Sequence, residues 1–581
     1  MTSLNGSRVA YFSMEIALSP ALPTYSGGLG ILAGDTLRSA ADLGVHMVAV
    51  SLVHRKGYFR QHVDENGNQC EESSPWSPEQ FLELMKPVVT VSIAGRKVRV
   101  RAWRYLVEGI TGHNVPVYLL DTALAENTPW DQALTDSLYG GDSYYRLCQE
   151  VVLGIGGVEI LPKLGHHHIG SYHMNEGHSA LLGAALVEQR LGARPLRSAT
   201  DEDIHAARHK IVFTTHTPVP AGHDQFPMEM VREVLGEDRA WAVERTGACP
   251  GGSLNMTLLA LFSSRYINGV AMRHGEVSRG MFPQYPIRAI TNGVHAATWT
   301  TAPFRQLYDR HIPEWKYDNL YLRYALGIPL EEIRHAHQDA KRTLAAEVQR
   351  RTGQSLDPNV MTIGFARRAA TYKRADLIFR DRDRLRAIAR TVGGLQIVFG
   401  GKAHPRDEGG KELIRKIAGH ARTLQDEVRV VYVEDFDWQW APLLYSGVDL
   451  WLNTPKRPQE ASGTSGMKAA LNGVPSLSIL DGWWIEGCLE GVTGWAIADQ
   501  PGQTDDEAYD AGSLYHKLEQ VILPMFYSNP DAYARVMRGA IAANGSFFNT
   551  HRMVSQYLDN AWFRDEEREV AETASAGIRK T

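Results

Sequence analysis

Short, continuously apolar runs separated by longer helical patterns dominate the hydrophobic pattern of this 581-residue chain. The runs are rich in β-branched residues and are bounded by Gly, Pro or Asn, which predicts strands. Unbroken apolar runs are typical of parallel strands, because such strands are covered on both faces. Strands are expected at residues 9–13, 48–53, 115–120, 211–215, 287–291, 362–365, 396–399, 428–433, 449–453 and 476–480.

One stretch departs from this pattern. Residues 89–107 alternate apolar and polar positions on either side of Ala94-Gly95-Arg96, which predicts a β-hairpin insertion. Elsewhere the alternation of strand and helix predicts an α/β fold, and the length fits two doubly wound sheets. Because Asn292-Gly293 is a turn signal after an expected strand, we expect an N-terminal domain at 1–290, a C-terminal domain at 291–563 and a polar tail at 564–581.

Composition narrows the class of protein. The chain is 44% hydrophobic and 22% charged with a net charge of −5, so nothing favours nucleic acid or a membrane surface as partner. No apolar stretch reaches the roughly 20 residues that span a bilayer, and no signal-peptide pattern opens the chain. The four cysteines form no CxxC pair. We therefore expect a soluble, cytoplasmic protein.

Residues 460–473 carry the most informative chemical pattern. They follow an expected strand, and their small residues predict a tight backbone that opens a helix. The free N–H groups and positive dipole of a helix start favour a phosphate. Lys468 stands about one turn inside, where its amine can form a Schiff base with an aldehyde cofactor. A capped helix with a surface lysine is the structural alternative, and these residues alone leave both open.

Residues 364–374 also follow an expected strand and concentrate positive charge. Arg367, Arg368, Lys373 and Arg374 lie close together where ligands bind in open α/β sheets. Arginine offers a planar fork and lysine a point charge, and both suit phosphate. Two phosphates in one site, on a cofactor and on a substrate, would need about this much charge. The alternative is a solvated basic helix face.

Residues 25–35 contain Gly28-x-Gly30-x-x-Ala33, which mimics a dinucleotide fingerprint. The next expected strand ends without the acidic residue that would hold a ribose, so we interpret the glycines as a loop approaching a phosphate or sugar. The loops at 173–178 and 213–218 carry histidines. Because no HExxH motif or carboxylate set accompanies His173 and His178, we expect structural histidines and no metal.

Together these segments resemble the α-glucan phosphorylase family, which includes glycogen, starch and maltodextrin phosphorylases. The resemblance runs from residues 11–15 past 481–484, and residues 460–464 with Met467-Lys468 form a highly specific signature. It is closest to the short bacterial and archaeal type, which carries Ser465-Gly466. The resemblance implies two Rossmann-like domains facing across a cleft, a GT-B-type fold, with pyridoxal 5′-phosphate as cofactor.

The resemblance also implies roles for individual residues. Lys468 would hold the cofactor covalently, and its phosphate would contact Thr464 and Ser465 with Arg367 nearby. Arg368 and Lys373 would bind the substrate phosphate and stabilise its developing charge. The residues expected to act on the reacting groups are Arg368, Lys373, His216 and Glu460. Further substrate contacts are expected from Gly28, Leu29, Asn292, Tyr372, Ser462 and Gly463.

The implied reaction is phosphorolysis of terminal α-1,4-linked glucose from a glucan, giving α-glucose 1-phosphate with retention. The cofactor's phosphate would relay a proton through the substrate phosphate to the departing oxygen. The expected partners are an α-glucan (glycogen, starch or maltodextrin), inorganic phosphate and glucose 1-phosphate, and a homodimer is one expected arrangement. Since the chain begins almost at its first core strand, we expect none of the N-terminal regulation of animal enzymes.

Other functions remain open at this stage. A nucleotide-sugar-dependent transferase of the glycogen synthase type shares the fold, but such enzymes carry Lys where this chain has Ser26, and a second glutamate where it has Lys468. That exchange favours the phosphorylase. A non-catalytic glucan-binding protein is disfavoured by the retained Glu460 and Arg368. A phosphorylase with a short, non-standard acceptor is a further alternative.

Overall fold

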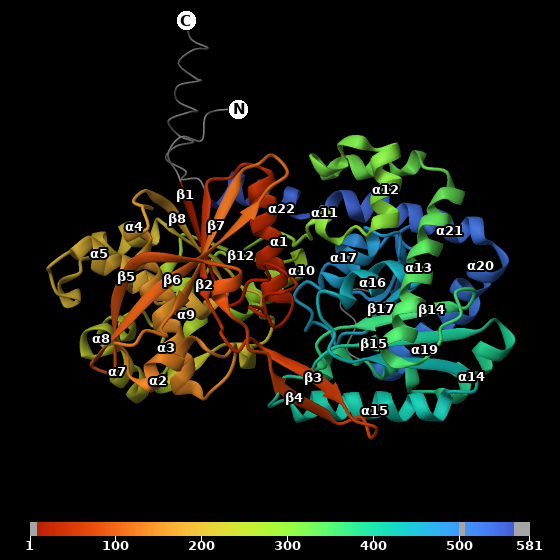
Figure 1. The fold of residues 1–581 in the computed structure, drawn as a ribbon, viewed down its shortest axis with the longest axis horizontal. Helices are drawn as coiled ribbons and strands as arrows, with labels where there is room; N and C mark the ends of the chain where they lie inside the picture. The colour runs from red at the N-terminus through yellow and green to blue at the C-terminus, as the bar shows by residue number, and fades with distance from the viewer. Residues whose placement is uncertain (1–7, 499–505, 563–581) are drawn as a thin grey trace, which may run out of the picture.

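The computed structural model describes residues 8–498 and 506–562, so the polar tail expected at 564–581 lies outside the described residues. The chain forms two lobes, each built around one large sheet (Figure 1). The N-terminal lobe has nine strands in the order β13-β12-β9-β8-β1-β2-β7-β6-β5. The C-terminal lobe has six, in the order β16-β15-β14-β17-β18-β19. The predicted α/β fold of two doubly wound sheets is confirmed.

The strands of the nine-stranded sheet are β1 (Arg8–Ser13), β2 (Met47–Leu52), β5 (Glu83–Ile93), β6 (Arg96–Glu108), β7 (Asn114–Asp121), β8 (Ile169–Asn175), β9 (Ile211–Thr214), β12 (Tyr266–Gly269) and β13 (Arg288–Ala289). Those of the six-stranded sheet are β14 (Met361–Ala366), β15 (Leu395–Gly400), β16 (Val428–Val433), β17 (Leu450–Asn453), β18 (Ser476–Ile479) and β19 (Gly494–Ile497). Two small sheets have two strands each: β3 (Phe59–Val63) and β4 (Gln69–Ser73) form a hairpin, and β10 (Gln225–Pro227) pairs with β11 (Ser253–Asn255).

Helices follow most parallel strands. Those of the first half are α1 (Gly28–Asp42), α2 (Pro129–Gln132), α3 (Ser143–Val151), α4 (Gly157–Lys163), α5 (Leu182–Leu191), α6 (Asp201–Arg208), α7 (Met228–Leu235), α8 (Glu237–Glu244), α9 (Met256–Ser263) and α10 (Met272–Met281). Those of the second half are α11 (Ala296–Trp299), α12 (Ala302–His311), α13 (Leu330–Thr352), α14 (Arg382–Thr391), α15 (Glu408–Leu424), α16 (Trp440–Gly447), α17 (Ser465–Ala470), α18 (Trp484–Gly487), α19 (Glu507–Lys517), α20 (Leu523–Ser528), α21 (Pro530–Gly539) and α22 (Thr550–Tyr557). None of the helices in the described ranges is long and apolar enough to cross a membrane.

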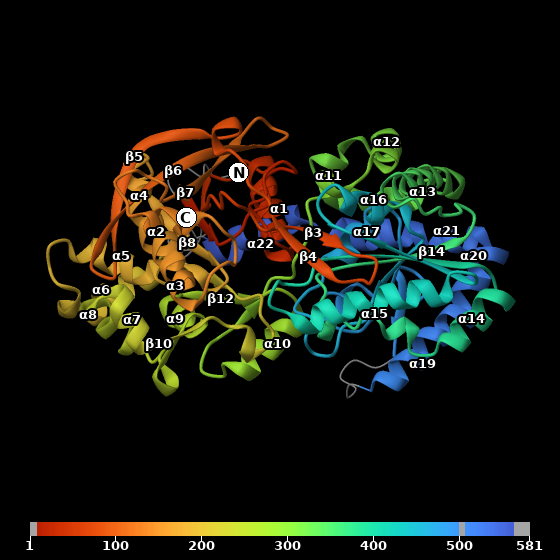
Figure 2. The same cartoon turned by 60° about the horizontal axis from the view of Figure 1, so that its bottom comes forward.

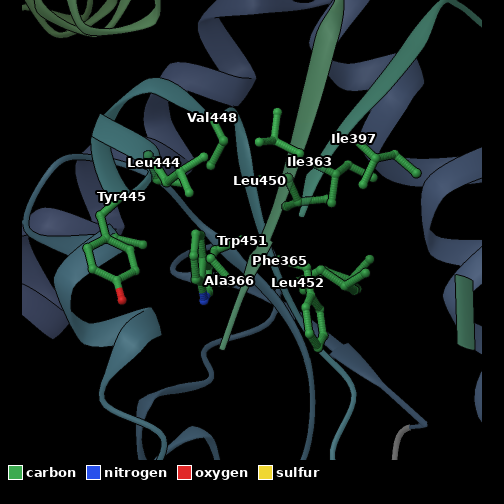
Figure 3. Packing of buried hydrophobic residues seen from close by; sticks show 14 of the residues in the cluster. Ile363, Phe365, Ala366, Ile397, Leu444, Tyr445, Val448, Leu450, Trp451 and Leu452 are labelled. Carbon is green, nitrogen blue, oxygen red and sulfur yellow. The ribbon is translucent and has the colours of Figure 1, made fainter. Parts of the chain in front are cut away.

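Burial explains why the apolar runs form strands. Every residue of β2, β9, β14 and β15 is buried, as expected for strands covered on both faces. In the C-terminal lobe, Ile363 and Phe365 of β14 pack with Trp451 of β17 and Leu444 of α16 (Figure 3). Helices α13 and α16 cover one face of this sheet, and α14 and α15 cover the other (Figure 2). Each lobe therefore has its own hydrophobic core.

The hairpin expected at 89–107 is longer than the alternating pattern indicated. β5 and β6 pair antiparallel around Ala94-Gly95, and β6 also pairs antiparallel with β7. The hairpin thus extends the edge of the nine-stranded sheet. Strand β8, which was not among the expected strands, runs through buried polar side chains, including Ser171, His173 and Asn175. These groups are satisfied by hydrogen bonds from distant segments, so no apolar run marks the strand.

The chain passes between the lobes twice. Val294 donates its N–H to the Phe548 carbonyl at 3.1 Å, and Thr550 donates to the Val294 carbonyl at 3.0 Å. The two segments that pass between the lobes, one around Val294 and the other around residues 548–550, therefore run side by side. After the second one, α22 packs on α1, and Tyr557 and Trp562 join a core cluster of the N-terminal lobe. The last described residues thus lie in the N-terminal lobe although they follow the second sheet in sequence.

Asp42, at the end of α1, ties both passing segments to the N-terminal lobe. Its Oδ2 accepts hydrogen bonds from His295 Nε2 at 2.8 Å and His551 Nε2 at 3.1 Å, and its Oδ1 accepts from the Ile110 N–H at 2.9 Å. All three side chains are buried. Burial alone would raise the pKa of Asp42, but these donors outweigh it and hold that pKa below its usual value.

We predict that Asp42→Asn lowers the free energy of unfolding by about 3 kcal/mol, because one buried acceptor would then face two imidazole donors. Chemical denaturation at pH 7 measures the change. Since the folded pKa of Asp42 lies below its unfolded value, the difference from wild type should shrink as the pH falls below about 4. Asp339→Asn, in an exposed pair with Arg342, is the matched control and should change stability by less than about 1 kcal/mol. Equal stability of Asp42→Asn and wild type would contradict the assignment.

Candidate active site

A cleft of about 950 Å³ lies between the lobes. It is lined by loops that follow β1, β8 and β9 on one side and β14, β15 and β17 on the other, so it lies at the carboxyl ends of both sheets. Every residue that the sequence predicted for the site lines this cleft: Gly28, Leu29, His216, Asn292, Arg367, Arg368, Tyr372, Lys373, Glu460, Ser462, Gly463, Thr464, Ser465 and Lys468. Segments far apart in sequence are thereby brought to one place.

The glycine loop opens α1 beside the cleft. A Cβ atom added to Gly27 or Gly28 would meet no other atom within 4 Å, so open space adjoins this backbone. Glu15 fixes the loop through its carboxylate. Its Oε2 accepts from the N–H groups of Ser26 at 2.6 Å and Gly27 at 3.1 Å, and its Oε1 accepts from the Tyr139 hydroxyl at 2.9 Å. The loop therefore presents backbone to the cleft in a fixed position.

The cations after β14 meet one carboxylate. Arg367 Nη2 lies 2.6 Å and Lys373 Nζ 2.7 Å from Glu460 Oε2. Burial alone would raise the pKa of Glu460, but the two cations outweigh burial and lower it to about 2. Lys373 is buried and lies in a single 3₁₀ turn, Thr371–Lys373, so the alternative of a solvated basic helix face is wrong. Arg368 stays exposed and lines the cleft.

Arg367 has one buried guanidinium nitrogen that is available to a ligand. Its Nη1 atom has no hydrogen-bond partner, although its Nη2 is paired with Glu460. Buried guanidinium N–H groups in proteins usually have a hydrogen-bond partner, so this one is available to a ligand in the cleft. Because arginine N–H groups form strong hydrogen bonds with phosphate oxygens, this position suits an anion.

Lys468 lies in α17 and is 4% exposed, so the alternative of a surface lysine is wrong. Its Nζ lies 4.2 Å from the ring centroid of Trp299 and 5.6 Å from that of Tyr445. Burial lowers the pKa of this amine to about 8, even though the charge of Asp35 acts in the opposite direction. About a tenth of the amine is therefore neutral, and nucleophilic, at pH 7, far more than for a lysine with the ordinary pKa.

The start of α17 faces the cleft without a side-chain cap. Thr464 precedes the helix and makes no capping hydrogen bond. Ser465 Oγ accepts from Trp451 Nε1 at 3.1 Å, which fixes the first turn against β17. Lys468 follows one turn later, as the sequence predicted. The backbone at residues 463–466 thus combines open N–H groups with the positive end of the helix dipole.

The cleft is also lined by neutral side chains that can form hydrogen bonds, among them His216, Asn292 and Ser462. His216 Nε2 lies 2.7 Å from Asn175 Oδ1; because Asn175 Nδ2 donates to Ser13 Oγ, Oδ1 is the acceptor and His216 donates. Burial lowers the pKa of His216 to about 3, so the ring is neutral at pH 7. Asn292 Oδ1 and Ser462 Oγ are buried without partners. Such atoms fit the hydroxyl groups of a bound sugar.

The sequence reasoning missed several residues of the cleft. Glu15 holds the glycine loop, and Trp299 covers the Lys468 amine. Glu176 has a φ of 73° and accepts from the His216 N–H at 2.8 Å and the Thr217 hydroxyl at 2.9 Å. In the sequence, the residues 173–178 drew attention because of His173. The His173 ring does not line the cleft; its Nδ1 accepts a hydrogen bond from Trp562 Nε1. An acidic residue directly after an apolar run was the available signal for Glu15, whereas no such run precedes Glu176.

Two doubly wound lobes that face each other across a cleft define a protein of the GT-B class. A family profile described as carbohydrate phosphorylase matches residues 238–493. The maltodextrin phosphorylase of Thermococcus litoralis is 39% identical over 95% of this chain and 70% of its own length. The glycogen phosphorylases of Mycobacterium tuberculosis and Aquifex aeolicus are 37% and 34% identical over 95% of this chain, and over 70% and 85% of their own lengths. The chain belongs to the carbohydrate phosphorylase family.

Proposed function

We propose that the protein is an α-glucan phosphorylase that uses pyridoxal 5′-phosphate and inorganic phosphate to release terminal α-1,4-linked glucose as α-glucose 1-phosphate, with retention. The observation that carries the proposal is the meeting of the buried Lys468 amine with Arg367, Arg368 and Lys373 in one cleft. The relatives named maltodextrin and glycogen phosphorylase support the substrate class.

The cofactor fits the groups at α17. Lys468 supplies a buried amine with a lowered pKa beside Trp299 and Tyr445, which offer flat apolar surfaces to a pyridine ring. The uncapped start of α17, with Thr464 and Ser465, suits the phosphate, and the unpartnered Arg367 Nη1 adds a charged donor. When bound there, pyridoxal 5′-phosphate would supply a phosphate group able to exchange a proton with the substrate phosphate.

Arg368 and Lys373 bind the substrate phosphate in this proposal. Arg368 is exposed to the cleft, and Lys373 is held at its edge by Glu460. The open space beside Gly28 leaves room for an anion against the backbone of the glycine loop. These charges are positioned before the reaction begins, so they stabilise the negative charge that develops on phosphate without reorganisation.

Glu460 is unsuited to act as the general acid of a glycosidase. With a pKa of about 2 it is ionised at neutral pH, because Arg367 and Lys373 hold its charge. Asp481, whose pKa burial raises to about 7, does not line the cleft. The proton for the departing glycosidic oxygen therefore comes from a phosphate in our proposal, and Glu460 orients the cations and accepts a hydrogen bond from the sugar.

The remaining polar groups hold the glucosyl unit. Asn292 Oδ1 and Ser462 Oγ, which lack partners, accept or share hydrogen bonds with its hydroxyls. His216 and Tyr372 line the same region, and Gly463 leaves space at the backbone. We further propose that the domain boundary lies near residue 290, that the enzyme is cytoplasmic and that it forms a homodimer.

Incubation of the purified protein with maltodextrin and inorganic phosphate should yield glucose 1-phosphate. A coupled assay for this product, run on a panel of glucans and short glucosides, tests the reaction and identifies the preferred glucosyl donor. Omission of phosphate is the matched control and should abolish the product. A protein that is inactive with phosphate but transfers glucose from a nucleotide sugar would refute the proposal.

The apoprotein should take up pyridoxal 5′-phosphate and gain near-ultraviolet absorbance that survives desalting. Uptake should accelerate as the pH rises through about 8, because only the neutral Lys468 amine is nucleophilic. Lys468→Ala should show no stable uptake, whereas Lys416→Ala, which changes an exposed lysine, should behave as wild type. Undiminished uptake by Lys468→Ala would overturn the cofactor assignment.

Arg368→Ala should raise the KM for phosphate by about tenfold or more, because a charged donor to the anion is lost. The KM for maltodextrin should change far less. Steady-state kinetics with each substrate varied in turn measure both constants. Arg380→Ala removes an exposed arginine that pairs with Glu507 and serves as the control. An unaltered phosphate dependence in Arg368→Ala would count against this role.

A further inference from the structure

A hairpin of the N-terminal lobe reaches across to the C-terminal lobe. β3 and β4 project away from the nine-stranded sheet and lie beside α15 (Figures 1 and 2). A Cβ atom added to Gly67, at the tip of the hairpin, would lie 2.7 Å from the Ala418 Cβ of α15. The hairpin is a sheet of its own and belongs to neither of the two large sheets.

Two buried glutamines join the hairpin to the loop after β15, residues 401–404. Gln61 is 0% exposed, and its Nε2 donates to the Gly401 carbonyl at 3.0 Å and to Gln69 Oε1 at 2.8 Å. Gln69 Nε2 donates to the Ala403 carbonyl at 2.9 Å, and its Oε1 accepts from the Ala403 N–H at 2.9 Å. The second lobe thus obtains hydrogen bonds for this loop from the first.

The hairpin also holds the turn after β16. The Gln61 N–H donates to Asp435 Oδ1, and the Asp435 N–H donates to Gln61 Oε1, both at 2.9 Å. Lys402 Nζ donates to the Phe59 carbonyl at 2.9 Å and lies 2.6 Å from Asp435 Oδ1. Lys402 therefore closes a small ring of contacts between the hairpin, the loop and the turn.

Loop 401–404 lies directly against the cations of the phosphate site. Arg367 donates its N–H to the Gly400 carbonyl at 3.1 Å, and Ala369 donates to the Lys402 carbonyl at 2.9 Å. Gly401 has a φ of 137°, and a Cβ atom there would lie 1.8 Å from the Arg367 carbonyl oxygen. The backbone on the two sides of Arg368 is therefore bonded to the end of β15 and to the loop that follows it.

Apolar packing also links the hairpin, loop 401–404 and residues 367–369. Ala369, Ala403 and Ile414 form a small buried cluster of their own, and Val63 of the hairpin and Tyr432 of β16 pack against it. Gly401 and Lys402 line the cleft itself. A shift of the hairpin would therefore move the backbone that carries Arg367 and Arg368.

We propose that Gln61 and Gln69 are positioning residues for the substrate phosphate. They hold loop 401–404, and through it the backbone of Arg368, in the geometry that binds the anion. This inference rests on the proposed function, because it assigns the role to the phosphate site of that reaction. Since the glutamines come from the opposite lobe, the phosphate site is complete only while the hairpin is docked.

The physical reason is the number of buried polar groups that the two amides satisfy. Replacement of Gln69 by Met, which has a similar volume, leaves the Ala403 carbonyl and N–H without their hydrogen-bond partner. Replacement of Gln61 by Met does the same to the Asp435 N–H and removes one donor from the Gly401 carbonyl, which keeps the Tyr432 hydroxyl. Buried backbone groups without partners are unfavourable, so the loop would adopt alternative positions. A small displacement of a charged group is enough to weaken a site that depends on fixed geometry.

The test is steady-state kinetics of the cofactor-loaded Gln61→Met and Gln69→Met variants, with phosphate and maltodextrin varied separately. We expect the KM for phosphate to rise about tenfold, with the KM for maltodextrin within about twofold of wild type. The stabilisation of each protein by inorganic phosphate, measured as the shift in its thermal unfolding midpoint, should shrink in parallel. A merely structural role would lower the midpoint without this selective loss of phosphate binding.

Arg422→Ala is the matched control, because Arg422 donates to the Glu65 carbonyl at 2.9 Å at the far end of the hairpin. It should leave both KM values unchanged. Gln69→Met leaves the bonds of Gln61 to Gly401 and Asp435 intact, so it keeps the test decisive if Gln61→Met does not fold. An unchanged KM for phosphate in a folded variant overturns the inference. Absence of phosphorolysis in the wild type would instead refute the proposed function.

Discussion

The cleft depends on the two ion pairs that the Glu460 carboxylate forms with Arg367 and Lys373. Two buried cations, Arg367 and Lys373, come from the loop after β14, and Glu460 comes from the segment after β17. Without that carboxylate the cations would repel each other in a region of low dielectric constant. With it, the two loops are held together across neighbouring strands, and the Arg367 atom left unpaired remains available to an anion. A single ion cluster thus fixes both the shape and the charge of the site.

The site is assembled from both lobes, and hydrogen bonds between the lobes hold its parts in place. Asp42 fastens the two segments that pass between the lobes, and Gln61 and Gln69 fasten the hairpin to the loop behind Arg368. Hydrogen bonds have narrow distance and angle requirements, so they specify one arrangement where apolar contact alone would permit many. The glycine loop, held by Glu15, is then set opposite the cations at a fixed separation.

Much of this architecture could be predicted from sequence, because buried parallel strands and the loops after them leave strong local signals. Strands such as β14 and β16 are apolar throughout or nearly so, and Lys468 follows its strand within a distinctive run of small residues. What could not be predicted depends on partners far away in the chain. Strand β8 contains polar residues that form hydrogen bonds with Ser13, Thr214 and Trp562, so its sequence does not have the apolar pattern of a buried strand. The hydrogen-bond partner of Gln61, the Gly401 carbonyl, lies in the second lobe, so the role of this glutamine cannot be inferred from its neighbours in sequence.

The return of the chain to its first lobe bears on how the polypeptide is made. Tyr557 and Trp562 complete a core that begins with Val9 and Tyr11, and Trp562 Nε1 donates to His173 within it. During synthesis, the ribosome therefore makes the whole segment between Tyr11 and Tyr557 before that core can close. Until then its apolar surface stays open to water and to other nascent chains. Chaperone dependence and truncation sensitivity would consequently concentrate at α22 and the residues up to Trp562.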